Sequence, residues 1–224
     1  MNLVELDNPF WSSLQTRHRD LAIMDGEAAR YPDAFAPFLG VSSRDADVTE
    51  SLERLVEPDR TVLLLGVAPD ALNGWTLKAF EPLAQMVCTR RLDPVDGPEV
   101  IELADEHRED MLALTALVYP HYFRERTMEL GRYFGIYQQD RLAAMIGERL
   151  GTESAQEISA VCTHPDFSGQ GLARRLVAML SNDNLERGYT PFLHVGFDNE
   201  RAKALYERMG YTLRRELSFW SLHR

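Results

Sequence analysis

The sequence lacks the features that mark membrane-spanning, secreted and metal-binding proteins. Its 224 residues contain no apolar run of the roughly eighteen residues that a membrane-spanning helix needs, so we expect none. The N-terminus has no basic region followed by an apolar core, so we expect no secretory signal and a cytoplasmic location. The only cysteines, Cys88 and Cys162, lie in apolar, strand-like runs. We therefore expect buried free thiols rather than a disulfide or a metal site.

Positive charge is also scarce. The chain has 24 Lys and Arg residues against 35 Asp and Glu residues, a net charge of −11. This balance argues against nucleic acid as a partner, and it favours cationic substrates such as amines, because a negative surface attracts them. The rest of the composition, 45% hydrophobic and 26% charged, is that of a soluble globular protein with enough residues for a large core.

A change of composition divides the chain. Residues 91–98, Arg-Leu-Asp-Pro-Val-Asp-Gly-Pro, have the character of a linker. The preceding residues 1–90 are predicted to form an α/β segment of unknown role, with helices opening at Asn8-Pro9 and near residues 51–56 and with strands at 61–67 and 75–89. This N-terminal segment could be a degenerate second lobe, an extension of the following sheet or a dimerisation element.

Strands and helices alternate in residues 99–224. The patterns predict strands at 99–103, 132–138, 142–150, 157–162, 192–195 and from 211, and helices at 104–117, from 172 and from 199. A turn at Gln139-Asp140 is expected to join the second and third of these strands. The alternation predicts a compact domain that contains both a sheet and helices.

The segment that follows the strand at 157–162 combines glycines with the start of a helix. It reads Thr163-His164-Pro165-Asp166-Phe167-Ser168-Gly169-Gln170-Gly171-Leu172-Ala173-Arg174-Arg175-Leu176. The glycines allow close approach of a ligand to the backbone, and the first N–H groups of a helix have no partner within it. Two arginines in the first turn oppose the helix dipole, a misfit that a bound polyanion would reverse. The segment predicts a phosphate site, with a plain glycine turn before a solvated helix as the alternative.

A second block carries a resemblance to a known family. Residues 199–211 fit the pattern Asn-x-x-Ala-x-x-Leu-Tyr-Glu-x-x-Gly-Tyr at every position. Together with the glycine segment, this order resembles the GNAT N-acetyltransferase superfamily over residues 99–224. The pyrophosphate loop of that family, Gln/Arg-x-x-Gly-x-Gly/Ala, corresponds here to residues 168–173, with Ser168 in place of the usual Gln or Arg. That departure affects one phosphate contact and leaves the backbone cradle intact.

The resemblance implies a fold and a co-substrate. The fold is of the α/β (α+β) type: a mixed, mostly antiparallel sheet flanked by helices, here with the additional N-terminal α/β segment. Two neighbouring parallel strands, expected at 158–163 and 192–195, splay apart in this family, and acetyl-CoA lies in the gap. The implied acetyl-CoA contacts are Val161, Cys162, Thr163, Ser168, Gly169, Gln170, Gly171, Leu172, Ala173, Arg174, Asn199 and Tyr206. No metal is implied.

Two of these residues are expected to have more specific roles, Asn199 from its position in the chain and Tyr206 by the resemblance. Asn199 is expected to cap or begin its helix, a role that Asp198 could equally take. Tyr206 is the candidate general acid, because a phenol with a pKa of about 10 can protonate a thiolate. The alternative for Tyr206 is a core position on the apolar stripe of its helix.

The general base is the less defined part of the site. Glu157 is the candidate, since alternation places its side chain on one face of the strand with Ser159, Val161 and Thr163. Glu148, His164 and His194 are rivals, and an ordered water is a further alternative.

The acceptor is expected to be an amine. The resemblance implies that one wall of the acceptor site is formed by His121-Tyr122-Phe123-Arg124-Glu125-Arg126, where the arginines would suit a carboxylate on the acceptor. The alternative is that Tyr122 and Phe123 only anchor the loop. The leading interpretation is direct acetyl transfer from acetyl-CoA to a primary amine of a small molecule or peptide, in a protein that could form a homodimer. The alternatives are a non-catalytic acyl-CoA sensor and an enzyme that uses another acyl-CoA.

Overall fold

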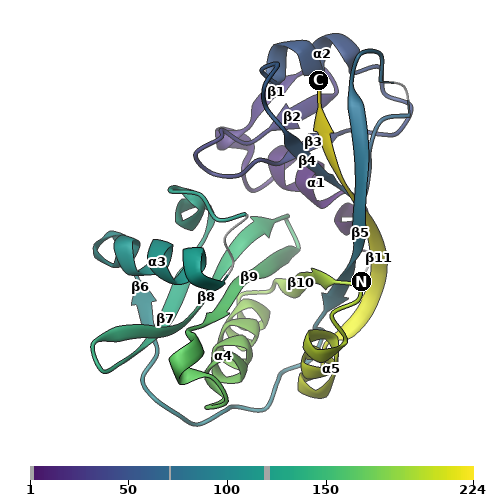
Figure 1. The fold of residues 1–224 in the computed structure, drawn as a ribbon. Coiled ribbons are helices and arrows are strands. Elements are labelled where there is room, and N and C mark those ends of the chain that lie inside the picture. The colour runs from purple at the N-terminus through teal and green to yellow at the C-terminus, as the bar shows by residue number, and fades with distance from the viewer. Residues whose placement is uncertain (1–2, 71, 119–121) are drawn as a thin grey trace.

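A computed structural model of the chain describes residues 3–70, 72–118 and 122–224. Its centre is an eight-stranded sheet in the order β4-β11-β5-β10-β9-β8-β7-β6 (Figure 1). The strands are β4 (Val62–Leu65), β5 (Thr76–Val87), β6 (Ile101–Leu103), β7 (Tyr133–Gln138), β8 (Arg141–Gly151), β9 (Ala155–Thr163), β10 (Thr190–Gly196) and β11 (Thr212–His223). All neighbours are antiparallel except β9 and β10, as expected of a mixed, mostly antiparallel sheet.

Helices cover the sheet. The longer ones are α3 (Arg108–Val118), α4 (Leu172–Glu186) and α5 (Glu200–Met209), and the shorter ones are α1 (Pro9–Gln15) and α2 (Thr49–Leu55). Single turns of 3-10 helix occur at η1 (Val4–Asp7), η2 (Arg19–Leu21), η3 (Asp105–His107), η4 (Thr127–Leu130) and η5 (Pro165–Phe167). The apolar stripe of α4 packs on β8, β9 and β10, and α3 packs on β8 and β9 in a separate cluster. The expected helices and strands are thus present, with ends that differ by a few residues.

The N-terminal segment contributes to the same core as the rest of the chain. It adds a small sheet, β1 (Ile23–Asp25), β2 (Ala28–Arg30) and β3 (Leu39–Val41), and its two strands β4 and β5 lie within the large sheet. β5 pairs with both β10 and β11 (Figure 1). Aromatic residues of α1 and the following loop also pack against β8, β10 and β11. Of the three alternatives, β4 and β5 fit an extension of the sheet, and the linker at 91–98 joins strands of one sheet.

Local sequence explains several of these elements. Gln139 and Asp140 both have positive φ angles, of 53° and 57°, which fits a two-residue hairpin turn between β7 and β8. Pro9 occupies the first turn of α1, where its missing N–H costs no hydrogen bond. Cys88 and Cys162 are buried and unbonded, as expected. Within the described residues, no helix has both the length and the apolar character that a membrane span needs.

The parallel pair β9 and β10 separates along its length. Their pairing runs only from Thr190 opposite Ala155 to Phe192 opposite Glu157, while each strand continues beyond that point. The separation is visible where β10 leaves β9 to follow β5 (Figure 1). Splayed strands were expected here, and the divergence leaves one edge of β9 without a neighbouring strand past Glu157.

A bulge in β9 changes which side chains face the same way. Ala160 has a φ of 49°, unusual for a residue with a side chain, and the pairing with β8 shifts register beside it. As a result Ile158 and Val161 both pack on the α4 side. The expected common face of Glu157, Ser159, Val161 and Thr163 is therefore wrong, because simple alternation does not continue through a bulge.

Candidate functional site

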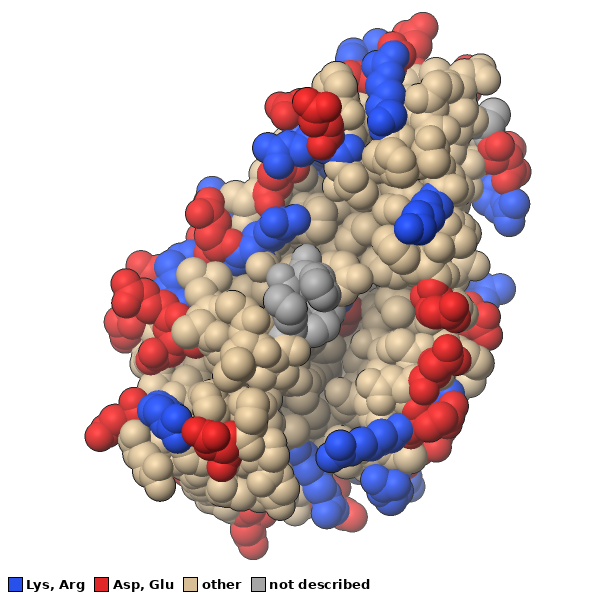
Figure 2. Space-filling model, in the orientation of Figure 1, with Lys and Arg blue, Asp and Glu red and all other residues tan. Residues whose placement is uncertain are grey.

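A cavity of about 370 Å³ lies between the separated strands. One part of its wall comes from β9, β10 and α5, namely Glu157, Ile158, Ser159, Ala160, Val161, Leu193, His194, Val195, Gly196, Asn199, Ala202 and Tyr206. The other part comes from the N-terminal segment, Tyr122 and the strands around β11. Figure 2 shows a hollow on this face with mainly uncharged residues on its walls and charged side chains farther out. The splay of the strands thus forms a cavity large enough for part of a small molecule.

The glycine loop leads from the end of β9 into α4. Gly169 and Gly171 have φ angles of 80° and 77°, a region that residues with a Cβ rarely adopt. An added Cβ at either glycine would meet no atom within 4 Å, so the space beside the loop is open. The amide of Arg175 bonds to the carbonyl of Gly171, so the three preceding N–H groups, from Leu172 to Arg174, lie ahead of the first helical hydrogen bond. This geometry suits an anion at the start of α4.

Side chains around the loop differ in their availability. Ser168, Gln170 and Arg174 are exposed, whereas Leu172 is buried against the core. Arg175, in contrast, turns toward the linker and donates a hydrogen bond to the carbonyl oxygen of Val95. Of the two first-turn arginines, Arg174 is the one placed to meet a phosphate.

The expected backbone contact for the co-substrate lies on β9. Cys162 points into the core beside α3, where burial raises the pKa of its thiol to about 12. Val161 and Thr163 are half-buried on the opposite face. Because β10 has already diverged, the backbone groups of this stretch face the gap and can pair with an extended ligand as an added strand would.

α5 places two of the expected residues on the cavity wall. Asn199 caps the helix, since its side-chain oxygen accepts a hydrogen bond of 3.0 Å from the amide of Ala202. Two turns after Asn199, Tyr206 lines the cavity, and its ring packs edge-to-face against Tyr211 at 5.8 Å between centroids. Tyr206 thus fits both interpretations from the sequence, a core position and a residue of the site, because it contacts the core and also reaches the cavity.

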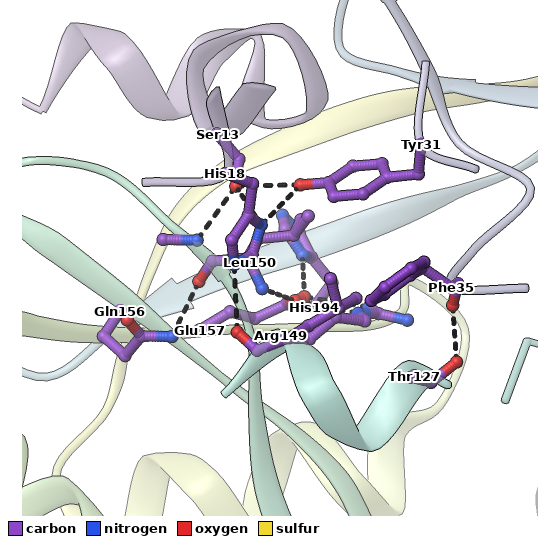
Figure 3. Close-up of polar contacts among 12 residues, drawn as sticks. Ser13, His18, Tyr31, Phe35, Thr127, Arg149, Leu150, Gln156, Glu157 and His194 are labelled. Atoms are coloured by element: carbon purple, nitrogen blue, oxygen red, sulfur yellow. Dashed lines mark hydrogen bonds and ion pairs between the residues drawn. The ribbon is translucent and has the colours of Figure 1, made fainter. Parts of the chain in front are cut away.

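Glu157 is held in a buried network on the cavity wall (Figure 3). Its carboxylate is 1% exposed and accepts two hydrogen bonds of 2.9 Å from Arg149, one of 3.1 Å from the amide of Leu150 and one of 2.8 Å from Nδ1 of His194. These four bonds occupy the lone pairs that a carboxylate offers. Burial alone would raise the pKa of Glu157, but the charge of Arg149 and the hydrogen bonds from His194 and Arg149 outweigh it and lower the pKa to about 2.

The same network fixes the protonation of His194. Gln85 donates to the carbonyl of Leu6 at 2.9 Å, and its oxygen accepts from Arg214 at 2.8 Å. These contacts orient the Gln85 amide so that its NH₂ group donates to Nε2 of His194 at 3.0 Å. His194 therefore carries its proton on Nδ1, toward Glu157, and its other nitrogen is already an acceptor.

These contacts argue against a carboxylate or histidine base in the cavity wall. Glu157 has a low pKa and no free lone pair, and His194 is engaged at both nitrogens. The other rivals lie elsewhere: Glu148 is buried in an ion pair with Arg132 at 2.7 Å, and His164 accepts a hydrogen bond from the amide of Asp166 beside the glycine loop. Neither of them lines the cavity.

A second buried polar cluster supports the N-terminal side of the site (Figure 3). His18 donates through Nε2 to the carbonyl of Leu130 at 2.9 Å, and its Nδ1 lies 2.8 Å from the hydroxyl of Tyr31 and 3.1 Å from that of Ser13. Burial lowers the pKa of His18, so the ring is neutral. Ser13 in turn accepts a hydrogen bond from the amide of Gly151, which ties the N-terminal segment to β8.

Several of these residues were missed from the sequence. Gln85 and Arg214 become site residues only through partners far along the chain, whereas Arg149 pairs with Glu157 on the neighbouring strand. The one local signal was the adjacent charged pair Glu148 and Arg149 within the largely apolar strand β8. No local pattern marked the apolar side chains of the N-terminal segment that line the cavity.

The predicted acceptor loop is only partly at the cavity. Tyr122 lines it, whereas Phe123 packs edge-to-face on Tyr133 at 5.8 Å in the α3 cluster. Arg126 is exposed, pairs with Glu129 and lies over the ring of Phe35. His121 falls outside the described residues. Neither Arg124 nor Arg126 lines the cavity, so the structure does not bring the expected arginines to it.

Comparisons with known proteins agree on one family. The family model described as FR47-like protein matches residues 133–221. A protein of Novosphingobium aromaticivorans assigned to the GNAT family of acetyltransferases is 30% identical, with 98% of each chain covered and a TM-score of 0.87. A comparison with curated protein sequences finds no significant match.

More distant structures share the fold. A GCN5-related N-acetyltransferase of Kribbella flavida is 18% identical, covers 94% of this chain and 92% of its own, and has a TM-score of 0.66. One from Sphaerobacter thermophilus is 15% identical, with coverages of 91% and 83% and a TM-score of 0.55. The similarity extends through the N-terminal segment, so that segment is part of the shared architecture.

Proposed function

The chain belongs to the GNAT family of acetyltransferases, and on that premise we propose that it transfers an acetyl group from acetyl-CoA directly to a primary amine of a small molecule or peptide. The observation that carries the proposal is the cavity between the splayed strands with Tyr206 on its wall, together with the open glycine loop that follows β9. Donor binding, stabilisation of the oxyanion and protonation of the leaving thiolate each have a candidate group in this chain, whereas deprotonation of the amine is left to water.

Binding of the donor falls to backbone groups. The N–H groups at the start of α4 suit the pyrophosphate, and Arg174 adds a positive charge beside them. Val161, Cys162 and Thr163 offer the free edge of β9 to the amides of the pantetheine arm. Backbone N–H groups at the bulge near Ala160 are suited to stabilise the oxyanion that forms when the amine attacks the thioester carbonyl.

Proton transfer involves Tyr206 and the solvent. Attack by the amine nitrogen forms a C–N bond, and collapse of the tetrahedral intermediate breaks the C–S bond and releases a thiolate. Tyr206 donates its phenolic proton to that sulfur, since the two groups have similar basicity. We assign no side-chain base: the amine loses its proton to water, and Glu157 acts as a positioning residue that holds His194 and Arg149 in the wall.

A Tyr206→Phe variant tests the assigned acid. We expect its dissociation constant for acetyl-CoA to stay unchanged and its turnover to fall by about 100-fold or more, because the proton donor is lost. Calorimetry measures the binding, and detection of released thiol measures the turnover. Tyr211→Phe is the matched control, since Tyr211 is buried and bonds to Ser181 instead of lining the cavity. Full turnover in Tyr206→Phe would remove Tyr206 from the mechanism.

A non-catalytic acyl-CoA sensor is the second candidate. Ser168 favours it, because it replaces the residue usual in the loop of this family. The sensor predicts saturable binding of acetyl-CoA without thiol release for any amine. Cytoplasmic location and homodimer formation remain predictions, which fractionation and sedimentation of the native protein would test.

A further inference from the structure

The cavity continues past Glu157 into a part with a different lining. We call this part the aromatic chamber and define it by Phe10, Phe38, Leu65, Leu83, Tyr122 and Phe219. Phe10 lies in α1, Phe38 in the loop before β3, Leu65 in β4, Leu83 in β5, Tyr122 after α3 and Phe219 in β11. None of them belongs to the glycine loop or to β9. The chamber is therefore separate from the elements suited to hold the donor.

Aromatic packing makes the chamber wall rigid. The rings of Phe10 and Phe38 stack at 4.2 Å between centroids with an angle of 9° between their planes. Phe219 packs against Tyr122 at 6.2 Å and against Phe80 at 5.2 Å. Phe80 is 41% exposed, which is unusual for so large an apolar side chain. Phe80 does not line the cavity itself, but through this contact it joins the exposed surface to Phe219 in the chamber wall.

The charged side chains of the cavity lining neutralise each other. Among the described lining residues only Arg149 and Glu157 carry formal charge, and they form a two-hydrogen-bond ion pair whose side chains are 11% and 1% exposed. Arg149 also lies over the ring of Phe38 at 5.0 Å. A carboxylate or a second ammonium on a bound molecule would consequently meet apolar surface without a charge of opposite sign to pair with.

We propose that the aromatic chamber binds an uncharged apolar group, aromatic or branched aliphatic, carried by the acceptor amine. This inference rests on the proposed function and adds a substrate class to it. Direct transfer requires the acceptor to reach the thioester while the donor fills the gap between β9 and β10, and the aromatic chamber is the part of the cavity wall that these two strands do not form. The chamber thus selects against the carboxylate that the arginines of residues 121–126 had led us to expect.

Matched pairs of amines test the substrate class. With acetyl-CoA, 2-phenylethylamine is compared with phenylalanine and 3-methylbutylamine with leucine, so that each pair differs only in the carboxylate. We expect kcat/KM to be at least about 100-fold higher for the member of each pair that lacks the carboxylate. Equal rates, or a preference for the amino acids or for putrescine, would overturn the inference while leaving the acetyltransferase proposal intact.

Two variants of one residue locate the selection in the chamber. Leu83→Trp should raise KM for 2-phenylethylamine by at least about tenfold, because the larger side chain fills the part of the chamber that the phenyl group of the amine would occupy. Leu83→Ala should shift the preference toward bulkier amines, which keeps the test valid if the larger residue impairs folding. Leu213→Trp is the control, because Leu213 is 50% exposed and does not line the cavity. Neither Leu83 variant should change acetyl-CoA binding more than about twofold.

An acyl-CoA series separates the two possible occupants. Acetyl-, butyryl- and hexanoyl-CoA are compared with 2-phenylethylamine held constant. If Leu83→Ala improves the use of hexanoyl-CoA and leaves the amine preference unchanged, the chamber holds the acyl chain and the inference is wrong. If acetyl-CoA binds and no amine releases thiol, the proposed function fails. In that case, calorimetry with the CoA-loaded protein tests the amine specificity of the chamber separately. Only tighter binding of the amine that lacks the carboxylate, in each pair, supports the inference.

Discussion

Replacement of Glu157 by Gln tests the buried network directly. The substitution preserves the shape of the side chain but leaves Arg149 buried without its ion-pair partner. A pKa lowered from 4.5 to about 2 corresponds to about 3 kcal/mol of stability at neutral pH. Removal of one partner from a buried ion pair typically costs about 3–5 kcal/mol, so the two values agree. We expect the free energy of unfolding to fall by about 3 kcal/mol at pH 7.

Urea unfolding followed by tryptophan fluorescence measures this loss as a lower midpoint at an unchanged slope. The control is Glu129→Gln, which removes ion pairs with Arg126 and Arg108. Glu129 is 34% and Arg126 49% exposed, so this loss should cost less than about 1 kcal/mol. A loss for Glu157→Gln no greater than that of the control would refute the reasoning.

The pH dependence of stability provides an independent test of the ionised state of Glu157. The pKa of Glu157 is lower in the folded protein than the ordinary 4.5, so its stabilisation is complete above that value and is lost as the pH falls toward 2. The difference in unfolding free energy between wild type and Glu157→Gln should therefore shrink between about pH 5 and pH 2. A difference that stays constant over this window would contradict the assigned ionisation.

Turnover of the same variant separates positioning from base catalysis. If the amine loses its proton to water, the acidic limb of the kcat/KM profile reflects protonation of the amine and persists in Glu157→Gln. If Glu157 were the base, that limb would disappear with the carboxylate. A series of amines with different pKa values provides the check. The apparent pKa of the acidic limb should change with the pKa of the amine.

Two further predictions concern the glycine loop and the thiols. Gly171→Ala and Gly188→Ala each place a Cβ at a positive φ, of 77° and 85°, with open space around it, so each should cost about 1–2 kcal/mol of stability. Only Gly171→Ala should also weaken acetyl-CoA binding in calorimetry, and equal affinities of the two variants would count against the phosphate site. Cys88 and Cys162 are buried with raised pKa values, so neither should react with a thiol reagent at pH 8 until urea unfolds the protein, and rapid labelling of the folded protein would contradict their burial.

Features that depend on adjacent residues were predictable from the sequence. Gly169 and Gly171 adopt positive φ angles before α4, and Asn199 caps α5, because backbone freedom and capping are local properties. Hydrophobic periodicity likewise gave the strands on both sides of the Gln139-Asp140 turn. The order of these elements was enough to identify the family and therefore the sheet with its splayed parallel pair.

The bulge and the ion pair of β9 were not predictable in the same way. Alternation along the strand placed Glu157 with Val161, but the positive φ of Ala160 reverses the side on which the later residues lie. Glu157 looked like a free carboxylate at the start of a strand, and only the position of Arg149 on β8 shows that it is fully paired. The pKa of a carboxylate depends on what surrounds it in space, which periodicity does not encode.

The sequence by itself thus determined the family, the order of the elements and the loop suited to phosphate, since each of these follows from short stretches of chain. The tertiary structure alone decided that residues 1–90 supply two strands of the main sheet and much of the aromatic chamber. It also showed that His194 is hydrogen-bonded to both Glu157 and Gln85. Gln85 and His194, 109 positions apart, meet only because β5 and β10 pair in the folded sheet, and hydrogen bonds and pockets depend on such distances in space.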